Sequence, residues 1–195
     1  MQPYTPIEFS LPEVNGISQK QLAEHLTLYK GYVTHVNKLY EEMDALIQIG
    51  GHEHEISELR RRLGFEFCGM RLHEYYFGDL ALGSKPLPSD SKLYEAIVAQ
   101  YGSFDTCITQ FKSSLSRGTG WMLLNYDPLY KRFHVNWVDE HHIGHLATLP
   151  VVIAIDMWEH AYMIDYLPGE KKTYIDNYLQ AINFETVATR FLAIQ

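Results

Sequence analysis

An aspartate and a histidine lie four residues apart directly after an apolar run near the C-terminus. The run covers residues 149–155, and its β-branched composition predicts a buried strand. Asp156 and His160 follow this strand, so both side chains are expected to point toward one place where the strand ends. A carboxylate and an imidazole that converge there form either an ion pair or half of a metal site.

Two more histidines have spacings that direct them inward. His25 flanks the apolar seam of a predicted helix and shares a helical face with Tyr32, seven residues later. His73 lies on the apolar stripe of the next predicted helix, where an unpaired imidazole is costly to bury. Taken alone, each is more often a hydrogen-bonded core histidine than a ligand. Together with Asp156 and His160 they offer three nitrogens and one oxygen, a set that suits iron, manganese or zinc.

Six of the ten histidines have ordinary structural explanations. Two alternate with glutamates in a polar turn, two lie on a helix or strand without an apolar context, and two fall in a loop-like stretch. In that order they are His52 and His54, His35 and His134, and His142 and His145. We interpret all six as solvated, partly exposed, capping or bridging residues.

Two long helices are predicted to carry His25 and His73. Apolar residues in 19–48 recur at alternating spacings of four and three, which is a sustained helical seam. Ser18 and Gln21 form a predicted capping box at its start. A glycine pair ends this helix, and a second helical pattern covers residues 56–80. Two long helices joined by a short turn pack antiparallel.

The second half of the chain mixes helices and strands. The proline-containing stretch 83–90 predicts a linker. After it, the patterns predict helices at 91–101 and 104–116 (the second capped by Ser103), strands at 118–125, 132–138 and 149–155, and closing helices at 157–166 and 172–192. We therefore expect an α+β fold, with an antiparallel long-helix hairpin in residues 1–83. An α/β domain with a roughly three-stranded antiparallel sheet is expected in residues 91–195.

Composition excludes several classes of protein. The apolar fraction of 46% and the aromatic fraction of 13% are those of an ordered globular chain. The net charge of −8 argues against a nucleic-acid partner, and no apolar stretch approaches the length of a membrane span. The N-terminus has no secretory signal pattern, and Cys68 and Cys107 lie far apart. We expect a cytoplasmic protein without a nucleic-acid or membrane partner.

Several segments of the chain carry a resemblance to one known family. Residues 156–162 read D-M-W-E-H-A-Y, and residues 118–121 read G-T-G-W. The segments 9–18, 67–77 and 174–184 match in the same order. The chain resembles the iron/manganese superoxide dismutases over nearly its whole length. The resemblance implies the helical hairpin and α/β half expected above.

The same resemblance implies a role for individual residues. The metal ligands would be His25, His73, Asp156 and His160, which would hold one iron or manganese ion per subunit. The residues implied around that set are Tyr32 at the entrance, Trp121 and Trp158 lining the pocket, Glu159 reaching His160 of a partner chain, and Tyr162 within the motif. A homodimer, or a tetramer, follows from the same resemblance.

Members of the family place a glutamine or a histidine against the metal-bound solvent from one of two positions. Four residues before His73 this chain has Gly69, which offers no side chain. Fifteen residues before Asp156 it has His141, which the resemblance therefore implies for this role. Its neighbours Glu140 and His142 are the alternatives if the loop is shifted by one residue.

Three features depart from the family pattern. The segment from His25 to Tyr32 is one residue shorter. The family's histidine pair in this segment is replaced by Leu28 and Tyr29, and Met163 replaces the second tyrosine of the motif. That tyrosine and one of those histidines pair across the dimer interface in the family. The departures therefore affect the usual proton route into the site and not the ligand set.

The resemblance implies a superoxide dismutase, an oxidoreductase that converts superoxide into dioxygen and hydrogen peroxide by redox cycling of its metal. Iron is the expected metal and manganese the alternative. Lys30 and Lys171 are candidates for a local positive potential toward the anionic substrate, or are ordinary surface lysines. Two other functions stay open. One is a non-catalytic, metal-binding or structural relative, and the other is a zinc hydrolase or iron oxygenase, whose ligand patterns fit this set poorly.

Overall fold

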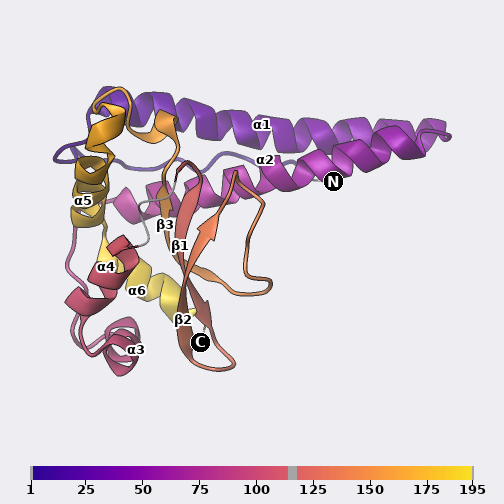
Figure 1. Ribbon diagram of the computed structural model, residues 1–195. Helices are drawn as coiled ribbons and strands as arrows, with labels where there is room; N and C mark the ends of the chain where they lie inside the picture. The colour runs from indigo at the N-terminus through magenta and orange to yellow at the C-terminus, as the bar shows by residue number, and fades with distance from the viewer. Residues whose placement is uncertain (1, 114–117, 195) are drawn as a thin grey trace.

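The structure, a computed structural model, describes residues 2–113 and 118–194 of the chain (Figure 1). In chain order its elements are α1 (Gln19–Ile49), α2 (Glu53–Leu80), α3 (Lys92–Tyr101), α4 (Phe104–Ser113), β1 (Trp121–Asp127), β2 (Arg132–Val138), β3 (Val151–Asp156), the 3-10 helices η1 (Glu159–Ala161) and η2 (Pro168–Glu170), α5 (Lys171–Ala181) and α6 (Phe184–Leu192). The α+β architecture expected from the sequence is confirmed. The last residues of the helix expected at 104–116 lie outside the described residues.

Helices α1 and α2 form the expected hairpin, whose tip projects beyond the rest of the molecule (Figure 1). Ser18 caps α1, because its hydroxyl oxygen accepts a hydrogen bond from the Gln21 N–H at 3.1 Å. The second half of the predicted capping box does not form. The Ser18 N–H donates instead to the Asp165 carboxylate at 2.6 Å, and the Gln21 side chain points to other partners.

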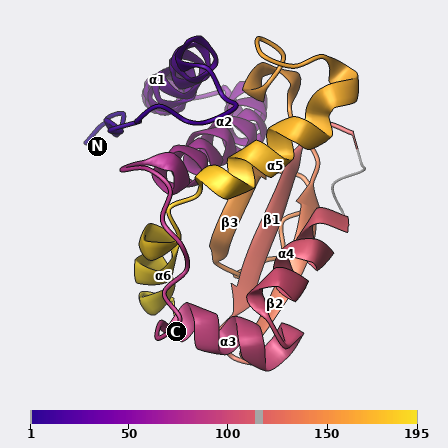
Figure 2. The same ribbon diagram turned by 90° about the vertical axis from the view of Figure 1, so that its left-hand side faces the viewer.

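The three strands form one antiparallel sheet in the order β2-β1-β3. Helices α3 to α6 gather on one side of it, as the two perpendicular views agree (Figures 1 and 2). The central strand β1 is buried from Trp121 to Tyr126, in keeping with an apolar sequence that only Asn125 interrupts. Its first residue, Trp121, pairs with Asp156 at the end of β3. The sheet therefore brings the motif aspartate next to a tryptophan from its central strand.

Two of the expected helices are wrong in extent. The predicted helix at 157–166 is reduced to the short η1, because its main-chain groups bond to side chains. The Trp158 N–H donates to Asp156 Oδ1 at 2.8 Å, and His160 O and Ile164 N both bond to the Gln21 side chain. Such side-chain bonds interrupt the helical ladder. Two of its bonds remain, from the Met163 N–H to Glu159 O and from the Tyr166 N–H to Tyr162 O, each at 2.9 Å.

The predicted helix at 172–192 is two helices, α5 and α6. The helix is interrupted at Ile182 and Asn183, where main-chain groups form hydrogen bonds to the end of α2 and to the linker. The Asn183 N–H donates to Asp79 O at 2.7 Å, and Ile182 O accepts from the Lys85 N–H at 3.3 Å. The Asn183 side chain then caps α6 by accepting from the Thr186 N–H at 3.1 Å. Asparagine is a preferred residue at such a helix start.

The core lies where the hairpin, the sheet and the C-terminal helices meet. Helix α2 packs against β3 on one side and against α1 on the other. Among the described residues, no helix has the length and apolar character needed to cross a membrane. The domain boundaries expected around residues 83 and 91 stay a prediction.

Candidate metal centre

Four elements bring the predicted ligand set together. His25 comes from α1, His73 from α2, Asp156 from the last position of β3, and His160 from η1. One ligand atom from each of these residues lies within 4.8 Å of the other three. His25, His73 and Asp156 are completely buried, and His160 is partly exposed.

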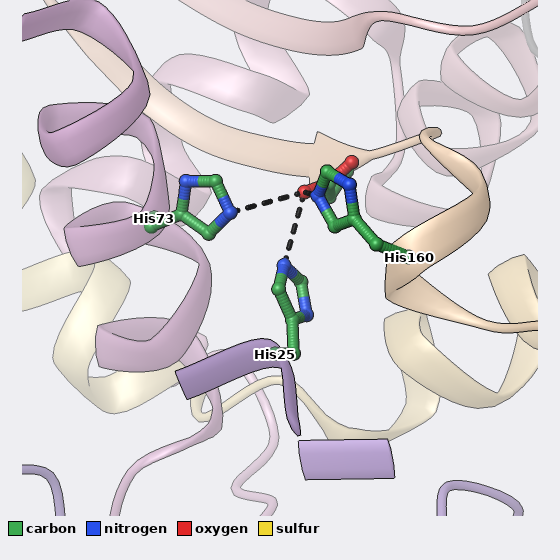
Figure 3. Close-up of side chains that lie close together, drawn as sticks. His25, His73 and His160 are labelled. Carbon is green, nitrogen blue, oxygen red and sulfur yellow. Dashed lines mark hydrogen bonds and ion pairs between the residues drawn. The ribbon is translucent and has the colours of Figure 1, made fainter. Parts of the chain in front are cut away.

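The three imidazoles point their Nε2 atoms at one carboxylate oxygen (Figure 3). Asp156 Oδ2 lies 3.1 Å from His25 Nε2, 3.1 Å from His160 Nε2 and 3.5 Å from His73 Nε2. A cluster of three nitrogens and one oxygen around a common point is therefore present, and it joins the hairpin to the end of the sheet.

Contacts behind the cluster fix the orientation of its members. His73 Nδ1 lies 2.6 Å from the Gly69 carbonyl oxygen and must donate to it, so a neutral His73 carries no proton on Nε2. Asp156 Oδ1 accepts from the Trp158 N–H, which leaves Oδ2 facing the imidazoles. The Tyr174 hydroxyl donates to the Asp156 main-chain oxygen at 2.8 Å. Such outer contacts are typical of metal-ligating side chains.

An unpartnered nitrogen atom and the chemistry of the donor set both indicate that a metal ion fits this cluster. His73 Nε2 is buried and has no hydrogen-bond partner among residues 2–113 and 118–194, although it carries a lone pair. A buried acceptor without a donor is costly unless a cation takes the lone pair. The donor set has no thiolate and one carboxylate, which suits iron, manganese or zinc. The cluster therefore fits a single divalent or trivalent ion.

For three of the four clustered residues the electrostatics favour the deprotonated form that a metal requires. Burial alone would raise the pKa of the Asp156 carboxyl, but its contacts with His160 and His25 hold that pKa well below the usual range. Burial lowers the pKa of His73 strongly and that of His25 to a lesser degree. Burial opposes protonation of His160 as well, yet Asp156 raises the pKa of His160. An ionised Asp156 between neutral His25 and His73 follows.

A hydrogen-bonded chain of three side chains lies beside the cluster. Trp121 Nε1–H donates to His141 Nδ1 at 2.8 Å, and His141 Nε2 lies 2.6 Å from the Tyr32 hydroxyl oxygen. Because an indole nitrogen only donates, a neutral His141 carries its proton on Nε2 and donates it to Tyr32. Burial lowers the pKa of His141 to about 4, so His141 stays neutral near pH 7. The hydroxyl hydrogen of Tyr32 is then free for another acceptor.

The position of Gly69 explains why His141 can occupy this place. A β-carbon added at Gly69 would lie 2.8 Å from the Tyr32 ring and 3.2 Å from the His141 ring. The space that a side chain at residue 69 would need is therefore filled by these two rings. Of the two alternatives to His141, Glu140 is exposed and His142 packs against Phe65.

The remaining predicted residues surround this core. Trp121 packs edge-on against His73 with ring centroids 5.1 Å apart, and Trp158 stacks on His160 at 6.0 Å. Tyr162 is buried and stacks on Tyr174 at 5.3 Å, away from the ligand atoms. The role expected for Glu159 requires a second chain and stays a prediction.

A cleft of 510 Å³ opens over His160, between α1 and η1. Its lining residues are Lys20, Glu24, Thr27, Leu28, Glu159, His160, Met163 and Ile164. Leu28 and Met163, which replace a histidine and a tyrosine of the family pattern, both line this cleft. Their exposed fractions are 42% and 47%. Tyr29, which with Leu28 replaces the histidine pair, is fully buried; its hydroxyl accepts from the Ile7 N–H and donates to Glu74.

The two lysines proposed to attract the anionic substrate both have protein partners. Lys30 forms an ion pair with Glu8 at 3.3 Å. Lys171 donates to the Gly118 carbonyl oxygen at 2.8 Å and lies over the ring of Tyr162. Burial lowers the pKa of Lys171, although the charges of Glu159 and Asp156 near it oppose this.

Sequence reasoning gave no role at the site to the buried polar residue Gln21. Its side chain contacts the main chain on both sides of Met163, as described below. The available signal was its position one helical turn before His25, which places it on the same face as a candidate ligand. It was interpreted only as part of a helix cap.

Fold and cluster together define a class of protein. It is an α+β protein with a candidate site for a single redox-capable ion, built from a helical hairpin, a strand end and the turn that follows. The protein family described as iron/manganese superoxide dismutases, C-terminal domain, matches residues 88–190 of this chain.

Full-length relatives extend this match to the helical hairpin. An iron superoxide dismutase of Aquifex aeolicus is 34% identical over 184 residues, which cover 91% of this chain and 85% of that protein. One from Cupriavidus metallidurans is 31% identical over 96% of this chain and 95% of its own length. A manganese superoxide dismutase of Halobacterium salinarum is 26% identical over 97% of this chain and 93% of its own length. The chain belongs to the iron/manganese superoxide dismutase family.

Proposed function

We propose that this chain is a superoxide dismutase that converts superoxide into dioxygen and hydrogen peroxide. The observation that supports this most is the cluster of three Nε2 atoms around Asp156 Oδ2 in a chain of this family. His25, His73, Asp156 and His160 are the proposed ligands of one ion per subunit. That ion would supply the one-electron redox chemistry of the reaction.

The protein side of the reaction is the handling of charge and protons. An ionised Asp156 favours the higher oxidation state of a bound ion, because it adds a negative charge inside a buried site. We assign proton handling to Tyr32 and His141, joined at 2.6 Å, with Trp121 holding the His141 tautomer. Trp121 and Trp158 exclude bulk water from this side of the pocket.

Iron is proposed before manganese. Supporting this order, the iron enzymes of Aquifex aeolicus and Cupriavidus metallidurans are more similar in sequence than the manganese enzyme of Halobacterium salinarum. The ligand set itself suits both metals. Expression in medium with one metal at a time, followed by elemental analysis and activity measurement, tests the choice.

A homodimer is proposed from the cleft over His160. Leu28, Met163 and Ile164 expose apolar surface next to Glu159, where a second copy would cover it. Sedimentation velocity on the wild type and on Met163→Glu tests this, because a buried carboxylate would weaken the dimer. A wild type that sediments as a monomer at micromolar concentration contradicts the proposal. We further propose a cytoplasmic location, on the basis of composition alone.

The decisive experiment is a superoxide-consumption assay on protein of known metal content. Activity that follows the iron or manganese content supports the proposal. A protein that takes up either metal but consumes no superoxide would be the non-catalytic relative. A protein that retains only zinc would favour a hydrolase instead.

A further inference from the structure

Gln21 connects two ligand-bearing parts of the site through its side-chain amide. It lies on α1 and is only 1% exposed. Its Nε2 donates to the His160 carbonyl oxygen at 2.6 Å, and its Oε1 accepts from the Ile164 N–H at 3.0 Å. We call these two hydrogen bonds the Gln21 bridge.

The two main-chain groups held by the Gln21 bridge are four residues apart. In an α-helix the Ile164 N–H would donate to the His160 carbonyl oxygen directly. Here the amide of Gln21 lies between them and satisfies both. The turn after His160 is therefore completed by a side chain from a helix 139 residues earlier in the sequence.

The segment that carries His160 has little stability of its own. Helix η1 covers three residues and has no side-chain cap. Short 3-10 pieces have poor hydrogen-bond geometry and depend on their surroundings. A second bond from α1, the Ser18 N–H to Asp165 at 2.6 Å, holds the far end of the turn. The main chain of His160 thus takes its position from the start of α1.

We propose that Gln21 is a positioning residue of the metal centre, which sets the His160 imidazole relative to that of His25. His25 follows Gln21 by one helical turn on the same face of α1, so the two ligands are tied through a rigid helix segment. This inference rests on the ligand set of the proposed function. A fifth residue, which contributes no ligand atom, thereby fixes the geometry of the fourth ligand.

The test compares Gln21→Met with a matched control, Gln100→Met. Methionine keeps the length of the side chain and removes both hydrogen bonds. Gln100 makes the same kind of bridge away from the site: its Nε2 donates to Phe133 O at 2.9 Å, and its Oε1 accepts from Phe133 N at 2.7 Å. The readouts are the dissociation constant for Mn²⁺, the visible spectrum of the iron-loaded protein, and hydrogen exchange of the Ile164 amide.

We expect Gln21→Met to raise the Mn²⁺ dissociation constant about 10- to 100-fold, as loss of an outer partner of a ligand does. The iron spectrum should shift and the Ile164 amide should exchange faster, whereas Gln100→Met leaves all three unchanged. A folded Gln21→Met with wild-type affinity and spectrum overturns the inference. Equal weakening in Gln100→Met overturns it too, because the effect would then be general destabilisation.

A second variant covers the case in which Gln21→Met does not fold. Gln21→Glu keeps an acceptor for Ile164 and loses the donor to His160, so weaker Mn²⁺ binding with a protected Ile164 amide supports the inference. Unchanged Mn²⁺ binding in Gln21→Glu contradicts it. A wild type that binds neither iron nor manganese contradicts the proposed function instead, and Ile164 exchange still measures the bridge.

Discussion

At this site the role of an individual residue depends on its hydrogen-bond partners more than on its amino-acid type. His141 and His142 are adjacent in sequence, yet only the first lies between Trp121 and Tyr32. Its two nitrogens have different partners, one a donor and one a hydroxyl, which fixes a single tautomer. A histidine in this position can pass a proton only through Nε2, toward Tyr32.

Replacement of His141 by alanine should separate turnover from metal binding. His141 is not among the four clustered residues, so metal content should remain that of the wild type. Turnover should fall about 10- to 100-fold, because Tyr32 loses the hydrogen bond to His141 that orients it. Elemental analysis and a superoxide-consumption assay on the same preparation measure both quantities. His142→Ala is the control, and a larger loss of turnover in this variant would reassign the role to His142.

At the scale of elements, the periodicity of apolar residues predicted helices correctly where contacts within the helix determine the structure. The predicted hairpin of α1 and α2 is confirmed, because the apolar seam that defines each helix comes from residues of that helix alone. The helix expected at 157–166 was wrong, since Gln21 and Asp156 take over its main-chain groups. A single sequence does not reveal such a bond over 139 residues. The four clustered residues could be predicted because helical periodicity directed His25 and His73 inward, strand-end spacing paired Asp156 with His160, and the family resemblance then joined the two pairs.

The close contact between α1 and α2 at Gly69 predicts that alanine substitutions at two glycines of α2 change the free energy of unfolding in opposite directions. Alanine at Gly69 would place its β-carbon against the rings of Tyr32 and His141, and overpacking of this kind costs about 1–3 kcal/mol. Alanine at Gly78 of the same helix meets nothing within 4 Å and should stabilise by about 0.4–1 kcal/mol. Urea unfolding of the two variants measures the difference. Only Gly69→Ala should also lower turnover, and equal stability of both variants would contradict this packing.

The contact between α2 and α6 contains a buried ion pair of Asp79 and Arg190. Burial raises the pKa of Asp79 from 3.8 to about 6, although Arg190 opposes this. The folded state therefore binds more protons than the unfolded state between these two pH values. The stability that Asp79 contributes is present below pH 3.8 and is lost as pH rises through about 6.

Asp79→Asn should remove this pH dependence. The stability of the wild type relative to Asp79→Asn is expected to fall by about 2 kcal/mol between pH 4 and pH 7, at 1.4 kcal/mol per pKa unit. Arg190→Met leaves Asp79 buried without its partner and should cost about 3–5 kcal/mol at pH 7 and less at pH 4. Urea unfolding at both pH values measures these differences. A wild type that gains stability over Asp79→Asn as pH rises would mean that Arg190 outweighs burial.

For the whole molecule, the cluster joins parts of the chain that are far apart in sequence. His25 and His73 come from the hairpin, whereas His160 follows the last strand (Figure 3) and Asp156 is the final residue of that strand. Without a cation, the buried site places one carboxylate against three imidazoles and leaves His73 Nε2 unpartnered among the described residues. An ion that binds only the folded arrangement must therefore stabilise both halves together.

Metal removal is predicted to destabilise the whole chain and not the site alone. An ion present at a thousand times its dissociation constant adds about 4 kcal/mol to the free energy of unfolding. Urea unfolding of the chelator-treated and the reloaded protein, followed by circular dichroism, measures this change. Asp156→Asn is the matched control, because it keeps the bond to the Trp158 N–H through Oδ1 but lacks the charge that an ion requires. Added metal should stabilise the wild type and leave this variant unchanged, and equal stabilisation of both would place the bound ion elsewhere.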